Sequence, residues 1–510
     1  MLYDVAPSIM NNMLQTRRQD LVVELQEAGL HARYRGLSVS IKELLLLASL
    51  FLLELSIMLM PMAIYMKGER PFAVFLTSKP GMVFQGTIVV LFTAGAFIGY
   101  QYWVSKRSQA SHFRLIVIMN LVTVILILVT AELTVRLSSR SSKEGETFGN
   151  TVLLPKNWQK VALHYRELLD KASGAVSVLV YDELLGWTVG PNIRSADGLY
   201  YSSSEGIRAP HAGITFADRP AKRRIALVGD SFTFGQEVTY EDTWGHHLEK
   251  ALGSEFQVLN FGVPGYGVDQ AYLRYEKDVR RWNPEIIIFS FINHDLLRTM
   301  SVYSFIAFPQ SILPFSTPRF VLSDGALERI NVPPLAPEAI FSRESISDLP
   351  FLEYQSDFDH WHWEKRLSQL PYLARLFVSR FPRWSHENPQ VSQEALVRLN
   401  ASIFQNFVRT ARQTQATPIV VYLPSGNELK SATQGSLAPI SKQVLEEASI
   451  GYADLRPCLM DLDPADRLAP DGTHYSPQAN AKIANCLYDV VNEEVGANEH
   501  QMVNDECCNG

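Results

Sequence analysis

The chain has 510 residues, which is enough for two or three domains of ordinary size. Its formal net charge is -7, and this balance argues against a nucleic-acid-binding protein, which would carry a basic face. The sparse cysteines include no C-x-x-C pair, so no zinc site is expected.

Three long apolar runs lie near the N-terminus, at about residues 44–66, 81–104 and 115–135. Each approaches the ~20 residues that a helix needs to cross a bilayer. Buried core helices are less favoured because three such runs follow one another with Lys or Arg nearby, and a cleavable signal peptide is less favoured because the first run starts late. We therefore predict a membrane anchor of three transmembrane helices over residues 43–137.

Basic residues set the expected orientation of this anchor. They are frequent in residues 1–42 and in the loop that contains Lys106, Arg107 and Arg114. The positive-inside rule then makes residues 1–42 a cytoplasmic segment and places everything after Arg136 outside. We expect a multi-pass protein of the cell membrane with an extracytoplasmic, periplasmic or extracellular, domain.

A juxtamembrane linker over residues 138–175, with a helix-like stretch at Trp158–Ala172, leads to a domain over residues 176–490. In that domain, apolar runs alternate with helical stretches at Trp244–Leu252, Gln270–Trp282 and Gln393–Thr414. The runs are RRIALVGDS, FQVLNFGVPG, PEIIIFSFI, TPIVVYLPS and IGYADLRP. Such alternation indicates a parallel sheet covered by helices on both faces, and ligands bind at the carboxyl ends of its strands.

Two segments depart from this alternation. Residues at about 300–390 are rich in Pro, Phe and Trp, and we interpret them as an insertion that forms a lid or binds substrate. Its segment SDFDHWHW offers metal ligands at Asp357, Asp359, His360 and His362, but an aromatic surface made by Trp361 and Trp363 is favoured over a metal site. The acidic, polar residues 491–510 are expected to form a disordered tail.

Polar motifs stand at the ends of the first three strands. Ser231, in Gly-Asp-Ser, precedes a helix whose N-terminus favours developing negative charge, although such a serine can also be a simple N-cap. Gly262 lets a backbone N–H approach a ligand closely, and the spacing around it is not that of a dinucleotide loop. Asn293 and His294 end the third strand with side-chain donors.

A fourth motif lies near the C-terminus, where Asp471 precedes His474 on a tight Gly turn. The carboxylate can fix the tautomer of the imidazole and leave its other nitrogen to take a serine proton. A solvent-exposed loop histidine is the alternative. Cys458 and Cys486 flank this loop, and we predict a disulfide between them in an oxidising compartment; two buried free thiols are the alternative.

Taken together, GDSFTFG, NFGVPGYG, INHDL and DGTHYSP resemble, in this order, the four blocks of the SGNH, or GDSL-type, hydrolase superfamily. The resemblance covers about Gly186 to Asp489. It implies a flavodoxin-like three-layer α/β fold and a Ser231–His474–Asp471 triad, with no cofactor and no metal. It also implies an oxyanion hole formed by the N–H groups of Ser231 and Gly262 and by a side-chain donor.

The third block departs from the family pattern, in which Asn directly precedes Asp. Here His294 precedes Asp295 and Asn293 stands one residue earlier, so either residue is a candidate donor. A gapless alignment from Pro284 favours His294, with Asn293 turned away or bracing the loop.

The resulting hypothesis is a membrane-anchored serine esterase or O-acyltransferase that acts on acyl, for example acetyl, esters of an envelope glycan or lipid. A transferase would need a membrane partner that supplies the acyl group. The alternative is a non-catalytic envelope assembly or glycan-binding protein on a degenerate scaffold; the altered third block favours it, and the intact Ser, Asp and His oppose it.

Overall fold

The computed structural model describes residues 99, 103, 113–171, 174–217, 223–308, 311–365, 370–380, 391–430 and 439–508. The segment predicted as cytoplasmic, 1–42, and the first predicted span, 44–66, lie outside these residues, as does the second, 81–104, except for Gly99 and Trp103. The third predicted span coincides with helix α5, Phe113–Ser138. A search of the described residues finds no helix with both the length and the apolar character needed to span a bilayer.

The chain divides into two compact units. The smaller one includes α5, β3 (Thr151–Leu153) and α13 (Tyr372–Arg380). Within it, the backbone N–H groups of Tyr372 and Leu373 donate to the Glu132 carboxylate of α5 over 2.9 and 2.8 Å. A carboxylate from one helix thus satisfies the free N–H groups at the start of another, where the helix dipole favours negative charge.

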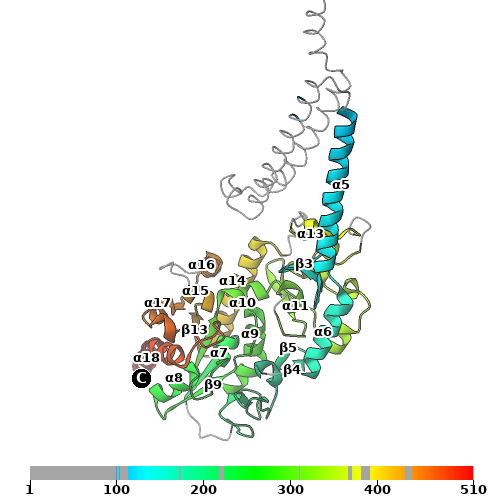
Figure 1. Ribbon diagram of the computed structural model, residues 1–510. Coiled ribbons are helices and arrows are strands. Elements are labelled where there is room, and N and C mark those ends of the chain that lie inside the picture. Colours follow the sequence, from blue (N-terminus) through cyan, green and yellow to red (C-terminus); the bar gives the residue numbers. More distant parts are fainter. Residues whose placement is uncertain are drawn as a thin grey trace, which may run out of the picture. The chain divides into compact units, whose positions relative to one another are not determined.

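The larger unit is built on a five-stranded parallel sheet (Figure 1). Its strands are β8 (Arg223–Val228), β9 (Phe256–Asn260), β10 (Ile286–Phe291), β13 (Thr417–Tyr422) and β14 (Ala453–Asp454). Their spatial order is β14-β13-β10-β8-β9, and all four neighbouring pairs are parallel. This is the strand order of a flavodoxin-like doubly wound sheet, so the predicted α/β class and all five predicted strands are confirmed.

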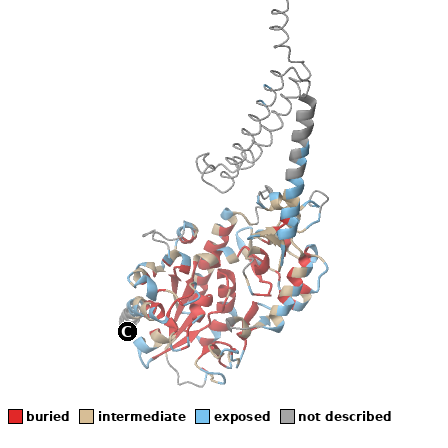
Figure 2. Ribbon diagram, viewed as in Figure 1, coloured by how far each residue is buried: buried red, intermediate tan, exposed pale blue. Residues whose placement is uncertain are grey.

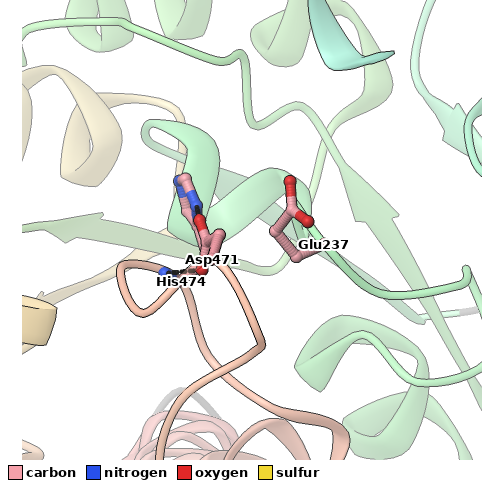
Figure 3. Close-up of side chains that lie close together, drawn as sticks. All are labelled: Glu237, Asp471 and His474. Carbon is pink, nitrogen blue, oxygen red and sulfur yellow. Dashed lines mark hydrogen bonds and ion pairs between the residues drawn. The ribbon is translucent and has the colours of Figure 1, made fainter.

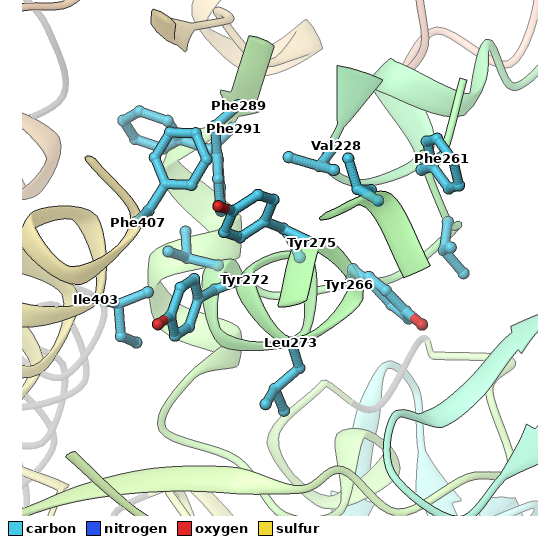
Figure 4. Close-up of a cluster of buried hydrophobic side chains, with 14 of the residues drawn as sticks. Val228, Phe261, Tyr266, Tyr272, Leu273, Tyr275, Phe289, Phe291, Ile403 and Phe407 are labelled. Atoms are coloured by element: carbon cyan, nitrogen blue, oxygen red, sulfur yellow. The ribbon is translucent and has the colours of Figure 1, made fainter. Parts of the chain in front are cut away.

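Helices cover both faces of the sheet. Alternate residues of β8 enter different cores: Ile225 and Leu227 join the cluster of α8 (Trp244–Leu252) and α18 (Pro477–Cys508). Ala226 and Val228 join the cluster of α9 (Val268–Arg274), α14 (Gln393–Gln413) and α16 (Pro439–Ala448), part of which Figure 4 shows. Because neighbouring strand residues face opposite sides and helices cover both, every residue of β10 is buried. The strands of the sheet are red in Figure 2.

The predicted helix Gln270–Trp282 is present but not regular. It begins as α9, continues as a π-helical turn over Tyr275–Val279 and ends as a 3-10 turn over Arg280–Trp282. The buried Arg274 and Asp278 form an ion pair of 2.5 Å across the junction.

Shorter helices and strands complete the two units. They are β1 (Arg140–Ser142), β2 (Gly145–Phe148), α6 (Trp158–Asp170), β4 (Leu179–Asp182), β5 (Gly186–Val189), β6 (Tyr201–Ser202), β7 (Arg208–Ala209), α7 (Ser231–Phe234), α10 (Asn293–Arg298), α11 (Ser304–Ala307), β11 (Arg319–Ser323), β12 (Ala326–Ile330), α12 (Pro337–Phe341), α15 (Gly426–Lys430) and α17 (Arg456–Met460).

Helix α6 corrects the predicted linker over 138–175. Its buried residues Trp158 and Tyr165 pack against the insertion, with Tyr165 stacked on Phe341 at 5.3 Å and Trp158 at 6.2 Å from Phe305. The C-terminal half of the predicted linker is therefore part of the larger unit. Together, this helix and the insertion form a hydrophobic core that is separate from the two cores of the sheet.

The predicted disordered tail, 491–510, also differs from the structure. Helix α18 continues to Cys508, well beyond the predicted start of the tail. The sequence after Val491 contains no proline and several good helix formers, so nothing in it requires the helix to end there.

Candidate active site

Ser231 opens helix α7 directly after strand β8. The residue before it, Asp230, is the helix N-cap, and its carboxylate accepts a hydrogen bond of 2.9 Å from the Phe232 N–H. The Ser231 hydroxyl lies 2.9 Å from Nε2 of His474. The N-cap interpretation of the serine is therefore not needed, since Asp230 fills that role and leaves the Ser231 hydroxyl to the imidazole.

The turn before α18 holds His474 in place, and Figure 3 shows it beside Asp471. His474 Nδ1 lies 2.7 Å from the Asp471 carboxylate, which also accepts from the N–H groups of Thr473 and His474 at 2.9 and 3.0 Å. Gly472, at a φ of +67°, supplies the left-handed conformation of the turn. Burial alone would raise the pKa of Asp471, but these hydrogen bonds hold that pKa below its ordinary value and keep the carboxylate ionised.

A disulfide joins Cys458 of α17 to Cys486 of α18, as predicted from the sequence. The bond encloses the segment with Asp471 and His474, which lies between the two helices. The bond therefore links α17 and α18, the helices on either side of the turn that contains His474.

Gly262 and Gly265 both follow strand β9, and they differ in their relation to Ser231. The N–H of Gly262, the predicted oxyanion donor, instead donates to the Asn260 side chain at 3.0 Å. A Cβ at Gly262 would stand 2.4 Å from the Phe234 nitrogen, so this glycine is needed for close packing against α7. Gly265, not Gly262, lines the cavity around Ser231.

The structure therefore corrects the predicted backbone donor. The N–H groups of Ser231 and Gly265 form no hydrogen bond with any of the described residues. Both remain available to a substrate oxygen, which is what an oxyanion hole requires. Gly265 adopts a φ of +83°, a conformation that side chains rarely allow. The motif contained this glycine, but its sequence spacing alone does not say which of the two faces the serine.

Asn293 and His294 both stand on the cavity wall, at the start of α10. The Asn293 side-chain oxygen accepts a hydrogen bond of 2.9 Å from Ser441 of α16. Its NH2 group, the part of an amide that can donate to an oxyanion, forms no hydrogen bond with the described residues. The His294 ring meets Phe308 of the insertion edge-on at 4.5 Å. Burial, together with the nearby charge of Arg298, lowers the pKa of His294 to about 3, so its imidazole is neutral near pH 7 and can donate one hydrogen bond.

A buried ionic network connects the nucleophile strand to α10. Arg298 donates to the Asp295 carboxylate at 2.5 Å and to the Tyr266 carbonyl at 2.9 Å, and it lies 3.4 Å from Asp230. Burial and the neighbouring charge of Asp230 raise the pKa of Asp295 well above its ordinary value. Because one guanidinium holds both acids, the ends of β8 and β10 are fixed relative to each other.

The site opens into a cavity of about 900 Å³. The insertion contributes Phe308, Ile312 and Leu313 to its wall, in agreement with its interpretation as a substrate-binding elaboration. Neither Trp361 nor Trp363 is among the described residues that line it; Trp363 instead packs edge-on against Trp158 at 6.4 Å. Nor do the acids and histidines of SDFDHWHW, all described, form a group of three that could hold a metal ion.

Glu237 is a cavity residue that the sequence motifs did not indicate. One of its carboxylate oxygens lies within 4.8 Å of ligand atoms of both Asp471 and His474 (Figure 3). It comes six residues after Ser231 in the sequence, beyond the short helix α7. No motif marks it, because its proximity to the histidine depends on the fold.

A serine hydroxyl bonded to an imidazole that a carboxylate holds, at the switch point of a doubly wound sheet, is the arrangement found in α/β serine esterases and acyltransferases. No protein-family model matches the chain, and no curated protein matches its sequence.

Solved structures do resemble it. A protein from Desulfitobacterium hafniense described as lipolytic and of the G-D-S-L family is 16% identical, with 52% of this chain and 98% of that chain covered and a TM-score of 0.26. The lipase/acylhydrolase from Enterococcus faecalis is 12% identical, with 53% and 96% covered and a TM-score of 0.28. An acetylxylan esterase from Geobacillus stearothermophilus is 15% identical, with 52% and 92% covered and a TM-score of 0.27.

The chain is thus similar over about half its length to solved GDSL-type lipolytic proteins and acetylxylan esterases. These TM-scores and identities are low, so an activity has to be inferred from the site itself.

Proposed function

We propose that the chain is a membrane-anchored serine esterase or O-acyltransferase that acts, outside the cytoplasm, on acyl esters of an envelope glycan or lipid. The observation that carries the chemistry is the hydrogen-bonded chain from the Ser231 hydroxyl through His474 to Asp471, with distances of 2.9 and 2.7 Å. These lengths are in the range over which a general base takes a proton from a nucleophile.

In the first half-reaction, the Ser231 oxygen attacks the ester carbonyl carbon while its proton passes to Nε2 of His474. The carbonyl oxygen gains negative charge, which the N–H groups of Ser231 and Gly265 and the side chain of His294, or of Asn293, would stabilise. The carbon–oxygen bond to the leaving alcohol then breaks, and His474 returns the proton to that alcohol. An acyl group remains on Ser231.

In the second half-reaction, water or another hydroxyl attacks the acyl carbon and gives its proton to His474. The bond to the Ser231 oxygen breaks, and the oxygen recovers the proton. Hydrolase and transferase differ only in which hydroxyl attacks. The Asp471 carboxylate keeps the imidazole in one tautomer and stabilises its charged form in both steps.

The proposed membrane anchor and the proposed substrate class rest on the sequence and on the size of the cavity. The three apolar runs and the bias of Lys and Arg support a membrane anchor, and the cavity of about 900 Å³ has room for a sugar unit together with an acyl group. A transferase of this kind would take its acyl group from a membrane partner.

The test is a fluorophosphonate probe, which reacts with an activated serine. The full-length protein is expected to be labelled and to hydrolyse a simple acetyl ester. Ser231→Ala should lose the label and several orders of magnitude in turnover. Undiminished labelling of the Ala variant would assign the nucleophile to another residue, and the absence of both labelling and turnover in the natural protein would favour the non-catalytic alternative.

A further inference from the structure

Glu237 stands beside the histidine of the triad without belonging to it. Its carboxylate is within 4.8 Å of a ring nitrogen of His474 and of an Asp471 oxygen, and the residue lines the same cavity as Ser231. Two hydrogen bonds of ordinary length span somewhat more than this gap. A hydroxyl group that donates to the Glu237 carboxylate therefore lies close to the imidazole.

The backbone of Glu237 is held in an unusual conformation. Its φ is 73°, in the left-handed region that glutamate rarely adopts, and its N–H donates to the Tyr200 hydroxyl at 3.0 Å. The side chain, by contrast, forms no hydrogen bond or ion pair with any of the described residues. Residues held in such sparsely populated backbone conformations cluster at active sites and ligand-binding sites.

The cavity wall changes character across the site. Near His474, it includes the polar residues Glu237 and Thr473 together with Phe232, whose ring centroid lies 5.0 Å from that of the imidazole. Near the proposed oxyanion donors, the wall is formed by apolar residues of the insertion. Phe308 contacts His294, and Leu313 packs against Gly265. An ester whose carbonyl oxygen occupies the oxyanion hole would thus have apolar surroundings on one side and a carboxylate on the side of the attacking hydroxyl.

We propose that Glu237 is a positioning residue for a polyhydroxylated acceptor. Its carboxylate accepts a hydrogen bond from one hydroxyl of a vicinal diol, as sugars present, and this holds the neighbouring hydroxyl where His474 can take its proton and where it can attack the acyl group on Ser231. The inference rests on the proposed function, because it concerns the second half-reaction, and it favours transfer to sugars over transfer to simple alcohols.

The partition of one acyl-enzyme between competing acceptors tests this role. Full-length protein in detergent is supplied with a p-nitrophenyl acetate donor and with either methyl glucoside, a vicinal diol, or methanol, which has one hydroxyl. The products measured are acetylated acceptor and free acetate. Glu237→Ala should lower the ratio of glucoside transfer to hydrolysis about tenfold, as expected for one lost hydrogen bond. The methanol ratio should change far less.

Two variants sharpen the result. Glu237→Gln keeps an acceptor oxygen but no charge and should retain most of the glucoside transfer, whereas a purely electrostatic effect on His474 would lower it as much as Ala does. Glu241→Ala, an exposed acid outside the cavity, should behave as the natural protein. An unchanged glucoside ratio in Glu237→Ala, or an equal fall with methanol, would overturn the inference alone. The absence of any acyl transfer or hydrolysis by the natural protein would overturn the proposed function and the inference with it.

Discussion

In the gapless alignment, His294 falls where the SGNH pattern has asparagine, and we propose it as the side-chain donor of the oxyanion hole because its chemistry permits the exchange. A neutral imidazole donates one hydrogen bond, as an amide can, and burial keeps the pKa of His294 at about 3. A histidine of ordinary pKa would change its charge near neutral pH, and this one does not. The substitution therefore leaves the oxyanion hole uncharged over the whole physiological range.

Removal of this donor should be costly. His294→Ala is expected to lower turnover of an acetyl ester by about 10²–10³, the usual cost of a lost oxyanion donor. Asn293→Ala should lose clearly less, because the gapless alignment from Pro284 makes His294 the donor. Steady-state rates of the purified variants give the ranking. The reverse order would identify Asn293 as the donor.

The low pKa of His294 also predicts how the reaction rate depends on pH. Because His294 is already neutral well above its pKa of about 3, its replacement by Asn should leave the shape of the rate profile between pH 5 and 9 unchanged, whatever its effect on the maximum. A profile whose acid limb moves in His294→Asn would show that this imidazole titrates during catalysis.

At this scale, the sequence predicted the residues that local motifs define. Ser231, Asp471 and His474 were predictable because each stands in a short pattern whose chemistry is recognisable. Gly265 and Glu237 were not, because one depends on which of two nearby glycines faces the serine, and the other on a contact with a turn more than two hundred residues away.

Among the elements, α17 and α18 carry the disulfide that encloses the histidine turn. It closes a loop over a sequence separation of 28 residues. In the chain-entropy account, loss of such a closed loop costs roughly 3–4 kcal/mol. Cys458→Ala combined with Cys486→Ala should therefore lower the melting temperature of the protein.

The control for this bond is reduction. A reductant should lower the melting temperature of the natural protein to a similar extent and should leave the double variant unchanged. Mass spectrometry of the unreduced protein from its native compartment detects the bond directly, and two free thiols there would contradict its presence.

Helix α9 contains a buried acid that makes the fold sensitive to pH. Asp269 accepts one hydrogen bond from the Gln270 N–H, and its second oxygen has no partner among the described residues. Burial raises the pKa of Asp269 to about 7, although this hydrogen bond and the charge of Arg319 act against the rise. The unfolded chain has the ordinary value of about 3.9.

The sign of the effect follows from these two values. With a raised folded-state pKa, the stabilising contribution of the protonated acid is complete below about pH 4 and is lost as pH rises to about 7, by roughly 1–4 kcal/mol in total. Asp269→Asn does not titrate. Its melting temperature relative to the natural protein should therefore be higher at pH 8 than at pH 5, and Glu241→Gln, an exposed control, should show no such trend. A difference independent of pH would mean that Asp269 is ionised throughout.

The elements themselves were predictable to different degrees. The five strands were found because a two-sided sheet makes every strand residue apolar, as in β10. The packing of α6 could not be predicted, because its buried residues Trp158 and Tyr165 are covered by an insertion that is distant in the sequence. A local pattern shows that a helix has an apolar face, but not what covers that face.

For the whole molecule, the order of the sheet explains why residues from four separate motifs meet. β8 and β10 are neighbours in the sheet although β9 lies between them in the sequence. The strand order therefore reverses between β8 and β10: β9 is added on one side of β8, and β10, β13 and β14 are added on the other. Ser231 follows β8 and His294 follows β10, which places both at the crevice that such a switch creates. The described residues that line the cavity all belong to the larger unit.

The proposed anchor determines which compartment this site faces. With three spans and a cytoplasmic N-terminus, the larger unit would lie outside, where a disulfide between Cys458 and Cys486 persists and where envelope glycans are accessible. A reporter that is active only in the cytoplasm should be silent when fused after Gly510 and active when fused in the loop near Arg107, while a reporter that needs export should give the opposite pattern. Cytoplasmic activity at Gly510 would mean an even number of spans, and the site would then have to act on an intracellular ester.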